Sequence, residues 1–374
     1  MKLTIAKSDL QRGLARIQSV VERRSTMPIL ANVLLTAEKQ KGGSTLELAA
    51  TDLEVGIRSV HEAEVSKPGS ITIGAKKLFE IVRELPDERV LLQASSEGFL
   101  DLQCARARFH LAGTAGEEYP ALATVSPERA MRFPAVLLSQ MIERTLYAAS
   151  VDETRYNLNG VFVEHLSDVG KIRMVATDGH RLACCDRSLG AEISGLGKGV
   201  IIPRKALSEL KKLVDEDGAD EIELGFEGNS CLARSAGVTL VMRLIEGEFP
   251  NYRQVIPRDP ARRVILAAEP LSHAIRRVAL LSAEHSRAIK VELQPGTLVL
   301  SSSNPDLGEA REETELDYAG DAIAIAFNAR YLLDATAASG AKELEFAFQD
   351  ALSPAQLVPT DDPDTLAVVM PMRL

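Results

Sequence analysis

The sequence is poor in the residues from which many catalytic and metal sites are built. It has no tryptophan, six histidines and four cysteines among 374 residues, and aromatic side chains make up 4% of it. The cysteines, Cys104, Cys184, Cys185 and Cys231, form neither a CxxC pair nor a cluster with histidine. We therefore expect no metal and no organic cofactor. Cysteines without a disulfide pattern are typical of a reducing compartment, which favours a cytoplasmic protein.

Long apolar runs are also missing. No stretch approaches the roughly 18 consecutive apolar residues that a membrane-spanning helix needs. The opening segment, MKLTIAKSDLQRGLARIQ, has polar residues where a secretory signal would need its apolar stretch. With 45% hydrophobic and 26% charged residues, the composition is ordinary for a globular protein. We expect no membrane partner.

What the sequence does contain is a threefold internal repeat. Three segments each show an apolar strand pattern, a polar turn, a second apolar strand and a final Asp or Asn. They are ILANVLLTAEKQKGGSTLELAATD ending at Asp52, NLNGVFVEHLSDVGKIRMVATD ending at Asp178, and AIKVELQPGTLVLSSSN ending at Asn304. Because both intervals between these end points are 126 residues, the pattern indicates three similar structural units.

Each unit also contains two segments with the apolar spacing of a helix. These six segments are residues 7–24, 75–85, 136–149, 203–213, 271–281 and 327–338. Three of these helices are expected to start near Gly74, Pro203 and Asn328, which suit helix entry. Helices alternating with short strands predict an α+β class. Pro- and charge-rich joints place the three domains at residues 1–125, 128–255 and 259–374.

The stretch VATDGHRLA places Asp178, His180 and Arg181 behind a predicted strand. An enzyme could use such an acid, base and cation, but the usual signatures of a nucleophile, metal or phosphate loop are missing. Asp52 and Asn304 hold the same place in the other repeats, and Asp or Asn there favours a turn closed by its own side chain. Only the middle repeat adds His and Arg, which suggests a recognition surface.

Positive charge collects on the predicted helices. The six segments together carry a formal charge of +9, whereas the whole chain carries −10. Charged residues on helices often only face solvent. A shared basic surface on an otherwise acidic protein would, however, attract phosphate, as binding of duplex DNA without sequence preference requires.

At this point the chain resembles a known family, the beta subunits of bacterial DNA polymerase III, or sliding clamps, from end to end. The resemblance rests on motifs in the family's order: MPILANVLL (27–35), TDLEV (51–55), TRYNLNGV (154–161), VATDGHRLA (175–183), VIIPRKAL (200–207), EGEFPNYRQVIP (246–257), NARYLLD (328–334) and VVMPMRL (368–374). The chain differs from some relatives at Val151, Asp152 and Asn157, in or near a loop that contacts DNA in the family. It also differs at Gln254 and Pro354, at the rim of the family's peptide pocket.

The resemblance implies three tandem similar domains with the DNA clamp fold, each with two helices packed on antiparallel sheets. Two copies would join head to tail as a homodimer and form a closed ring around double-stranded DNA. Such a ring binds without sequence preference and confers processivity without being an enzyme. Its partners would be the replicative polymerase alpha subunit, the clamp loader through its delta subunit, translesion polymerases, and mismatch-repair and ligation proteins. Its location would be the cytoplasm, in association with the nucleoid.

The resemblance also implies three sets of site residues. Those matching DNA contacts are Arg24, Arg155, Tyr156, Arg204 and Lys205. Those matching a pocket for a linear clamp-binding peptide are Leu158, Thr177, Gly179, His180, Arg181, Leu182, Pro250, Val255, Asn328, Tyr331, Val368, Met370, Pro371, Met372, Arg373 and Leu374. Those expected at the dimer interface are Arg106, Arg108, Phe109, Leu111, Leu280, Leu281, Glu309, Glu312 and Glu313. The alternatives are a scaffold protein without a DNA role and an enzyme that uses Asp178 and His180.

Overall fold

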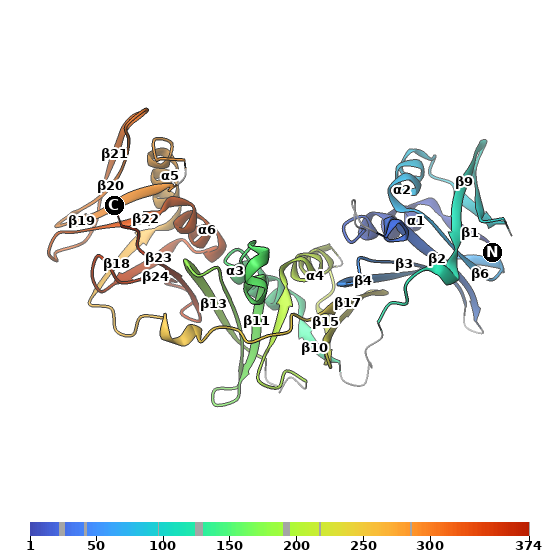
Figure 1. The fold of residues 1–374 in the computed structure, drawn as a ribbon, viewed down its shortest axis with the longest axis horizontal. Coiled ribbons are helices and arrows are strands. Elements are labelled where there is room, and N and C mark those ends of the chain that lie inside the picture. The colour runs from blue at the N-terminus through green and yellow to red at the C-terminus, as the bar shows by residue number, and fades with distance from the viewer. Residues whose placement is uncertain are drawn as a thin grey trace. The chain divides into compact units, whose positions relative to one another are not determined.

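The computed structural model describes residues 1–21, 27–40, 43–95, 97–123, 130–189, 195–216, 218–284 and 286–373 (Figure 1). The described chain divides into two compact units. One contains residues 1–136 and 205–244, and the other contains residues 137–204 and 245–374. No helix among the described residues is both long and apolar enough to cross a membrane.

The first unit is built on a sheet of thirteen strands in the order β10-β15-β16-β17-β4-β3-β2-β6-β9-β8-β7-β1-β5. Its strands are β1 (Lys2–Ala6), β2 (Asn32–Gln40), β3 (Gly43–Thr51), β4 (Val55–Glu62), β5 (Glu64–Lys67), β6 (Gly69–Gly74), β7 (Arg89–Ala94), β8 (Phe99–Cys104), β9 (Ala107–Ala115), β10 (Met131–Pro134), β15 (Glu221–Glu227), β16 (Ser230–Ser235) and β17 (Val238–Arg243). All neighbouring pairs are antiparallel. Pairs such as β2–β3 and β3–β4 are joined by short turns, as alternating apolar strands predict.

The second unit holds a sheet of eight strands, β14-β11-β12-β13-β25-β24-β23-β18, and a sheet of four, β21-β20-β19-β22. The strands are β11 (Gly160–Leu166), β12 (Lys171–Thr177), β13 (Arg181–Ser188), β14 (Val200–Pro203), β18 (Arg262–Ala267), β19 (Ala288–Gln294), β20 (Thr297–Asn304), β21 (Gly308–Glu315), β22 (Ile323–Asn328), β23 (Glu343–Phe348), β24 (Ala355–Pro359) and β25 (Thr365–Val369). One apolar cluster of this unit includes the buried rings of Phe327, Phe346 and Phe348.

Within the residues that the structure describes, six α-helices lie where the apolar spacing predicts them. They are α1 (Lys7–Ile17), α2 (Ala75–Glu84), α3 (Ala135–Leu146), α4 (Arg204–Glu216), α5 (Ala268–Ala279) and α6 (Ala329–Ser339). In α1 the residues Leu10, Leu14 and Ile17, which recur with the spacing of one helix face, are completely buried. Burial of each such side chain contributes about 1.5–3 kcal/mol. The first predicted helix, residues 7–24, is longer than the observed one, because α1 ends at Ile17. After that end, the Ser19 hydroxyl donates to the carbonyl of Arg16 in the last turn of α1.

The predicted repeat is confirmed by the strand pairing. Each of the three repeated segments forms an antiparallel hairpin, namely β2–β3, β11–β12 and β19–β20. The middle repeat contributes strands to both units, because β17 pairs with β4 in the first and β13 pairs with β25 in the second. This sharing of sheets explains why the compact units number two although the sequence repeats three times.

Candidate functional site

Asp178 closes the turn between β12 and β13 with its own side chain. Its Oδ1 accepts hydrogen bonds from the backbone amides of His180 and Arg181, at 2.9 and 3.0 Å. Asp52 bonds the amides of Glu54 and Val55 in the same way, and Asn304 bonds that of Asp306. The predicted turn is confirmed in all three repeats, and it is the structural reason for Asp or Asn at this position.

The natural use of Asp or Asn at this turn position suggests two variants of Asp178 to compare. Asp178→Ala removes the acceptor for two amides, whereas Asp178→Asn keeps an acceptor oxygen, as Asn304 does naturally. We expect amide hydrogen exchange at His180 and Arg181 to accelerate about tenfold or more in the Ala variant and to stay near the parent rate in the Asn variant. Equal exchange rates in the two variants would contradict this role of the carboxylate.

Arg181 is held on both sides of its guanidinium group. Nε donates to Asp178 at 3.1 Å and Nη1 donates to Asp334 of α6 at 2.6 Å. The guanidinium carbon lies 4.6 Å from the ring centroid of Tyr331 and 5.4 Å from that of Tyr147. Only 9% of the Arg181 side chain is exposed, so the two carboxylates and two rings replace its water. The turn is thereby fixed to α6.

Beside this turn lies an apolar pocket with a volume of about 180 Å³. It contains nine of the predicted peptide-pocket residues: Leu158, Thr177, Gly179, Arg181, Leu182, Pro250, Val255, Val368 and Met370. Leu182 and Val368 face each other across the β13–β25 pair and are 2% exposed, whereas Val255 at the rim is 45% exposed. Such a largely apolar hollow with few polar groups suits an apolar side chain of a ligand.

Asn251 and Tyr252 also line this pocket and were missed by the sequence interpretation. Their signal is their position, because they directly follow Pro250 in the motif EFPNYRQV. The Tyr252 hydroxyl donates to the buried Glu164 carboxylate and accepts from Arg173 Nη1 at 3.2 Å. Burial, and after it Glu164, raise the pKa of Tyr252, so the phenol remains a neutral donor beneath the pocket.

Other predicted peptide-pocket residues lie elsewhere. His180 and Tyr331 face a second cavity, with ring centroids 6.4 Å apart. Asn328 caps α6 by accepting from the amide of Arg330. Met372 and Arg373 line a third cavity, over β19 to β21, and Met372 donates its amide to the Ala326 carbonyl of β22. Pro371, between them and Met370, is half-buried, and Leu374 lies outside the described residues.

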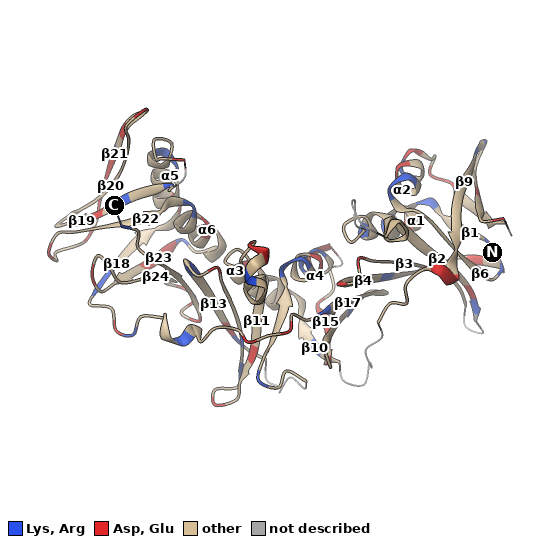
Figure 2. Cartoon of the chain, in the orientation of Figure 1, with Lys and Arg blue, Asp and Glu red and all other residues tan. Residues whose placement is uncertain are grey.

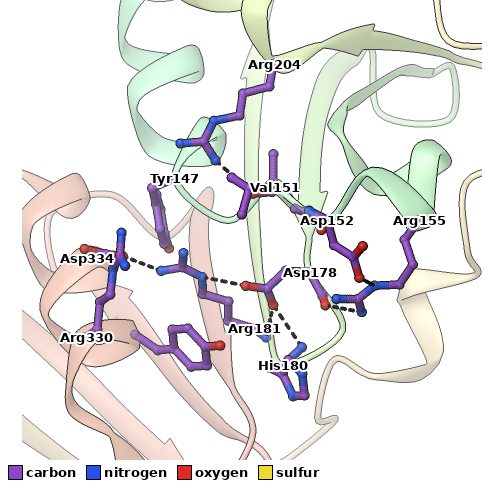
Figure 3. A pocket seen from close by; sticks show the side chains of 13 residues that line it. Tyr147, Val151, Asp152, Arg155, Asp178, His180, Arg181, Arg204, Arg330 and Asp334 are labelled. Carbon is purple, nitrogen blue, oxygen red and sulfur yellow. Dashed lines mark hydrogen bonds and ion pairs between the residues drawn. The ribbon is translucent and has the colours of Figure 1, made fainter. Parts of the chain in front are cut away.

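The second cavity is the larger of the two beside the turn, at about 520 Å³, and Figure 3 shows its lining. Four arginines face it: Arg155, Arg181, Arg204 and Arg330. Three aspartates balance part of this charge: Asp152, Asp178 and Asp334. Arg181 is common to this cavity and the apolar pocket, so the turn forms a wall between them.

The predicted DNA contacts are in different environments. Tyr156 is 53% exposed, in the short helix η4 (Glu153–Leu158). Arg155 bonds Asp152 and the carbonyl of Asp178, and the half-buried Arg204 donates to the carbonyl of Ala149. Lys205 makes an ion pair with Asp52, the turn residue of the first repeat. Arg24 lies outside the described residues. Figure 2 shows further cationic residues on α2 and α4.

The predicted interface residues surround two open strand edges, one in each unit. The exposed Arg106 directly precedes β9, and β9 carries the exposed Arg108 and the half-buried Phe109 and Leu111. The pairing of β9 with β6 covers only Gly113–Ala115. β21 carries Glu309, Glu312 and Glu313 and is the terminal strand of its sheet. At the end of α5, Leu280 is 77% exposed and Leu281 is half-buried.

The acidic edge strand already has cationic partners within its own unit. Arg277 of α5 makes a bidentate pair with Glu312, at 2.5 and 2.9 Å, and Arg311 bonds Glu313. The Arg277 hydrogen bond lowers the pKa of Glu312, which therefore stays ionised. Glu309 accepts a hydrogen bond from the Ser303 hydroxyl.

Family models match three consecutive parts of the chain. The N-terminal domain of the DNA polymerase III beta subunit matches residues 1–123, its central domain residues 133–251 and its C-terminal domain residues 253–373. The chain belongs to the DNA polymerase III beta subunit family. Its three-domain clamp fold, with helices on antiparallel sheets, is the fold of this family.

Named beta sliding clamps are similar to the chain over its whole length. Those of Caulobacter vibrioides NA1000, Pseudomonas aeruginosa PAO1 and Escherichia coli K12 are 38%, 37% and 31% identical, and each alignment covers 100% of both sequences. The solved beta sliding clamp of Caulobacter crescentus superposes with a TM-score of 0.94 at 38% identity, covering 100% of this chain and 99% of that one. A clamp from Bartonella birtlesii, solved with griselimycin bound, has a TM-score of 0.94 at 34% identity and full coverage of both chains.

Beta sliding clamps are processivity factors of DNA replication and not enzymes, so the enzymatic hypothesis for Asp178 and His180 loses its support. Asp178 has a structural role in the turn instead. Among the described residues, no three His, Cys, Asp or Glu side chains are grouped as a metal site would need. The four cysteines are free thiols and all are buried.

Proposed function

We propose that two copies of this beta subunit close head to tail into a ring around double-stranded DNA and tether the replicative polymerase to it. The ring would be made of domains at residues 1–125, 128–255 and 259–374 of each copy. The observation that carries the proposal is the apolar pocket beside the Asp178 turn, in a chain whose family is the sliding clamps. Tethering raises the effective concentration of the polymerase at the primer end.

The pocket supports binding of a short, largely apolar linear peptide. Leu158, Leu182 and Val368 give it buried apolar walls, and the exposed rim residues Pro250, Val255 and Met370 leave it open to a ligand. The partners would be the alpha subunit of the replicative polymerase, the delta subunit of the clamp loader, translesion polymerases, and mismatch-repair and ligation proteins. All of these would carry a linear clamp-binding motif and therefore compete for one site per chain.

A direct test is the affinity of a fluorescent peptide from the polymerase alpha subunit for the dimeric protein. Deletion of Met370–Leu374 removes Met370 from the rim and the backbone bond from its amide to the His180 carbonyl. We expect the deletion to reduce peptide binding about 100-fold or more while the protein stays dimeric. Full-strength binding after deletion would refute this assignment of the pocket.

Ring closure is supported by the two open edges. An exposed strand edge offers unpaired N–H and C=O groups to another strand. Arg106 and Arg108 adjoin one edge and three glutamates lie on the other, so a β9–β21 pair between copies would have opposite charges beside it. Phe109 and Leu111 would face Leu280 and Leu281 and bury apolar surface. In the cell such a ring would be cytoplasmic and associated with the nucleoid.

DNA contacts would involve the phosphate backbone and no particular base, which lets the ring slide. We expect the triple variant Arg24→Gln, Arg204→Gln and Lys205→Gln to remain on a primed circular DNA in an amount about tenfold lower than the parent protein at moderate salt. Glutamine is preferred to glutamate because Lys205→Glu would set a second carboxylate against Asp52, the present partner of Lys205. The readout is the amount of clamp that co-elutes with DNA after loading.

The matched control for that variant is Arg89→Gln, Arg132→Gln and Arg263→Gln. These arginines lie on strands β7, β10 and β18, and each is more than half exposed. The control loses the same charge from surfaces outside the predicted contacts. Equal loading of the two triple variants would show that only net charge matters and would remove the proposed contact set.

A further inference from the structure

His61 of β4 is a buried histidine outside the surfaces described above. It is 9% exposed, and its Nε2 shares a hydrogen bond of 2.8 Å with the hydroxyl group of Ser59, which is 1% exposed. Residues two positions apart on a strand face the same side of a sheet, so both polar groups lie on one side of it. Helix α1 packs against β4 on this side (Figure 1). The polar pair therefore lies in the core between a helix and a sheet.

The helix and the imidazole ring meet at Gly13 of α1. A Cβ atom at Gly13 would lie 2.4 Å from His61 Nε2 and 2.5 Å from Leu48 Cδ1, distances that real side chains do not adopt. Glycine is unfavourable inside a helix, because it loses more conformational freedom on folding than alanine does. Here it lets the backbone of α1 rest directly on the ring. The ring thus supports the middle of α1.

The charged groups that act on His61 come from α1. Burial is the main cause that lowers the pKa of His61 from its ordinary value of 6.5. The negative charge of Asp9 opposes this change, whereas the positive charges of Arg16 and Arg12 add to it. Asp9 already makes an ion pair with Arg12, at 2.9 Å. The folded protein therefore favours the neutral ring.

The sheet surrounds the ring with apolar side chains. Leu46 of β3 pairs with His61, and Val238 of β17 lies on the same side of the sheet; both are completely buried. Glu47 of β3 and Glu62 of β4 alternate with these residues and belong to the opposite side. An imidazolium ion here would bring a full charge and two N–H donors into an apolar space beneath two arginines.

We propose that His61 is a pH-sensitive anchor of α1, which holds the helix on the sheet while the ring is neutral and releases it when the ring gains a proton. Because folding lowers the pKa of His61, the unfolded segment accepts the proton at a higher pH than the folded one. The stabilising contribution of the neutral ring is therefore complete above pH 6.5 and is lost as the pH falls below that value. Arg12 and Arg16 belong to α1, so acidification also loosens two cationic side chains of this unit.

Amide hydrogen exchange of the intact protein tests the anchor. Protection of the α1 amides, corrected for the intrinsic effect of pH on exchange, is measured at about pH 8 and about pH 5.5. The parent is compared with His61→Gln and with His110→Gln, a matched control whose side chain is 61% exposed on β9. We expect protection to fall about fivefold or more in the parent and in the control, and to stay within about twofold in His61→Gln. An equal fall in all three proteins would overturn the anchor.

Gly13→Ala tests the contact between helix and ring without a change of pH. Alanine is the better helix former, so the helix by itself would gain stability. The new methyl group would, however, collide with His61 Nε2 and with Leu48. We expect α1 to be less protected than in the parent already at about pH 8. Parental or higher protection would show that α1 does not rest on the ring, and would contradict the proposal.

NMR titration of the parent protein, labelled at histidine, follows the proton itself. The His61 resonance is identified by its absence in His61→Gln, or in His61→Asn if the longer side chain is not tolerated beneath Gly13. We expect the ring to gain its proton below pH 6.5, over the same pH range in which α1 loses protection. A midpoint at or above pH 6.5 would overturn the proposal. Neither DNA nor peptide enters these measurements, so their outcome is independent of the proposed function.

Discussion

We expect Val255→Asp to abolish detectable peptide binding. Val255 lies at the rim of the apolar pocket and is 45% exposed, so the substitution leaves the buried walls Leu182 and Val368 intact. A bound peptide would take the new carboxylate out of water without giving it a partner. We expect an affinity at least about 100-fold lower, or about 2.8 kcal/mol, measured by fluorescence anisotropy with the polymerase alpha peptide.

Val169→Asp is the matched control. Val169 is 58% exposed and lies in the turn before β12, at the other end of that strand from Thr177. The same chemical change there should leave the peptide affinity within about twofold of the parent. A Val255→Asp protein that binds the peptide as well as Val169→Asp would place the peptide elsewhere on the surface.

We expect Leu280→Asp to convert the proposed dimer into monomers at micromolar concentration. Leu280 is 77% exposed beyond the end of α5, an unusual position for a leucine unless another surface covers it. In the proposed dimer it faces Phe109 and Leu111 of the second copy, where a carboxylate would lose its water. We expect association to weaken about 100-fold or more, measured by sedimentation velocity over a dilution series.

Leu280→Asp also serves as a control for peptide binding, and Val255→Asp serves as a control for dimerisation. Leu280→Asp monomers should bind the peptide with parental affinity, because the apolar pocket contains no residue of that surface. Val255→Asp should remain dimeric. A dimer that persists in Leu280→Asp at nanomolar concentration would contradict the proposed interface, and a monomer that also loses the peptide would indicate a wider structural defect.

Local patterns in the sequence predicted much of the fold. Alternating apolar residues followed by Asp or Asn gave the three hairpins and their turns, because period-two burial and the side-chain bond of Asp178 are both local effects. The apolar spacing located the six α-helices of the described residues, with α1 shorter than expected. The pocket residues came from the resemblance, and nine of them line one hollow.

Local sequence patterns did not predict the contacts between segments that are distant in the sequence. Lys205 pairs with Asp52 and Arg181 with Asp334, partners that lie 153 residues away in each case. The separation of His180 and Tyr331 from the apolar pocket depends on where Arg181 is held, which is a tertiary effect. The division of the middle repeat between two sheets likewise follows from the β4–β17 and β13–β25 pairs, which join different repeats.

The central claim is that the chain forms a ring, and negative-stain electron microscopy of the purified protein alone tests it most directly. We predict class averages that show a closed ring with a central hole and a sixfold outline, from two copies of three similar domains. Compact particles without a hole, at a concentration where the protein is dimeric, would contradict the ring.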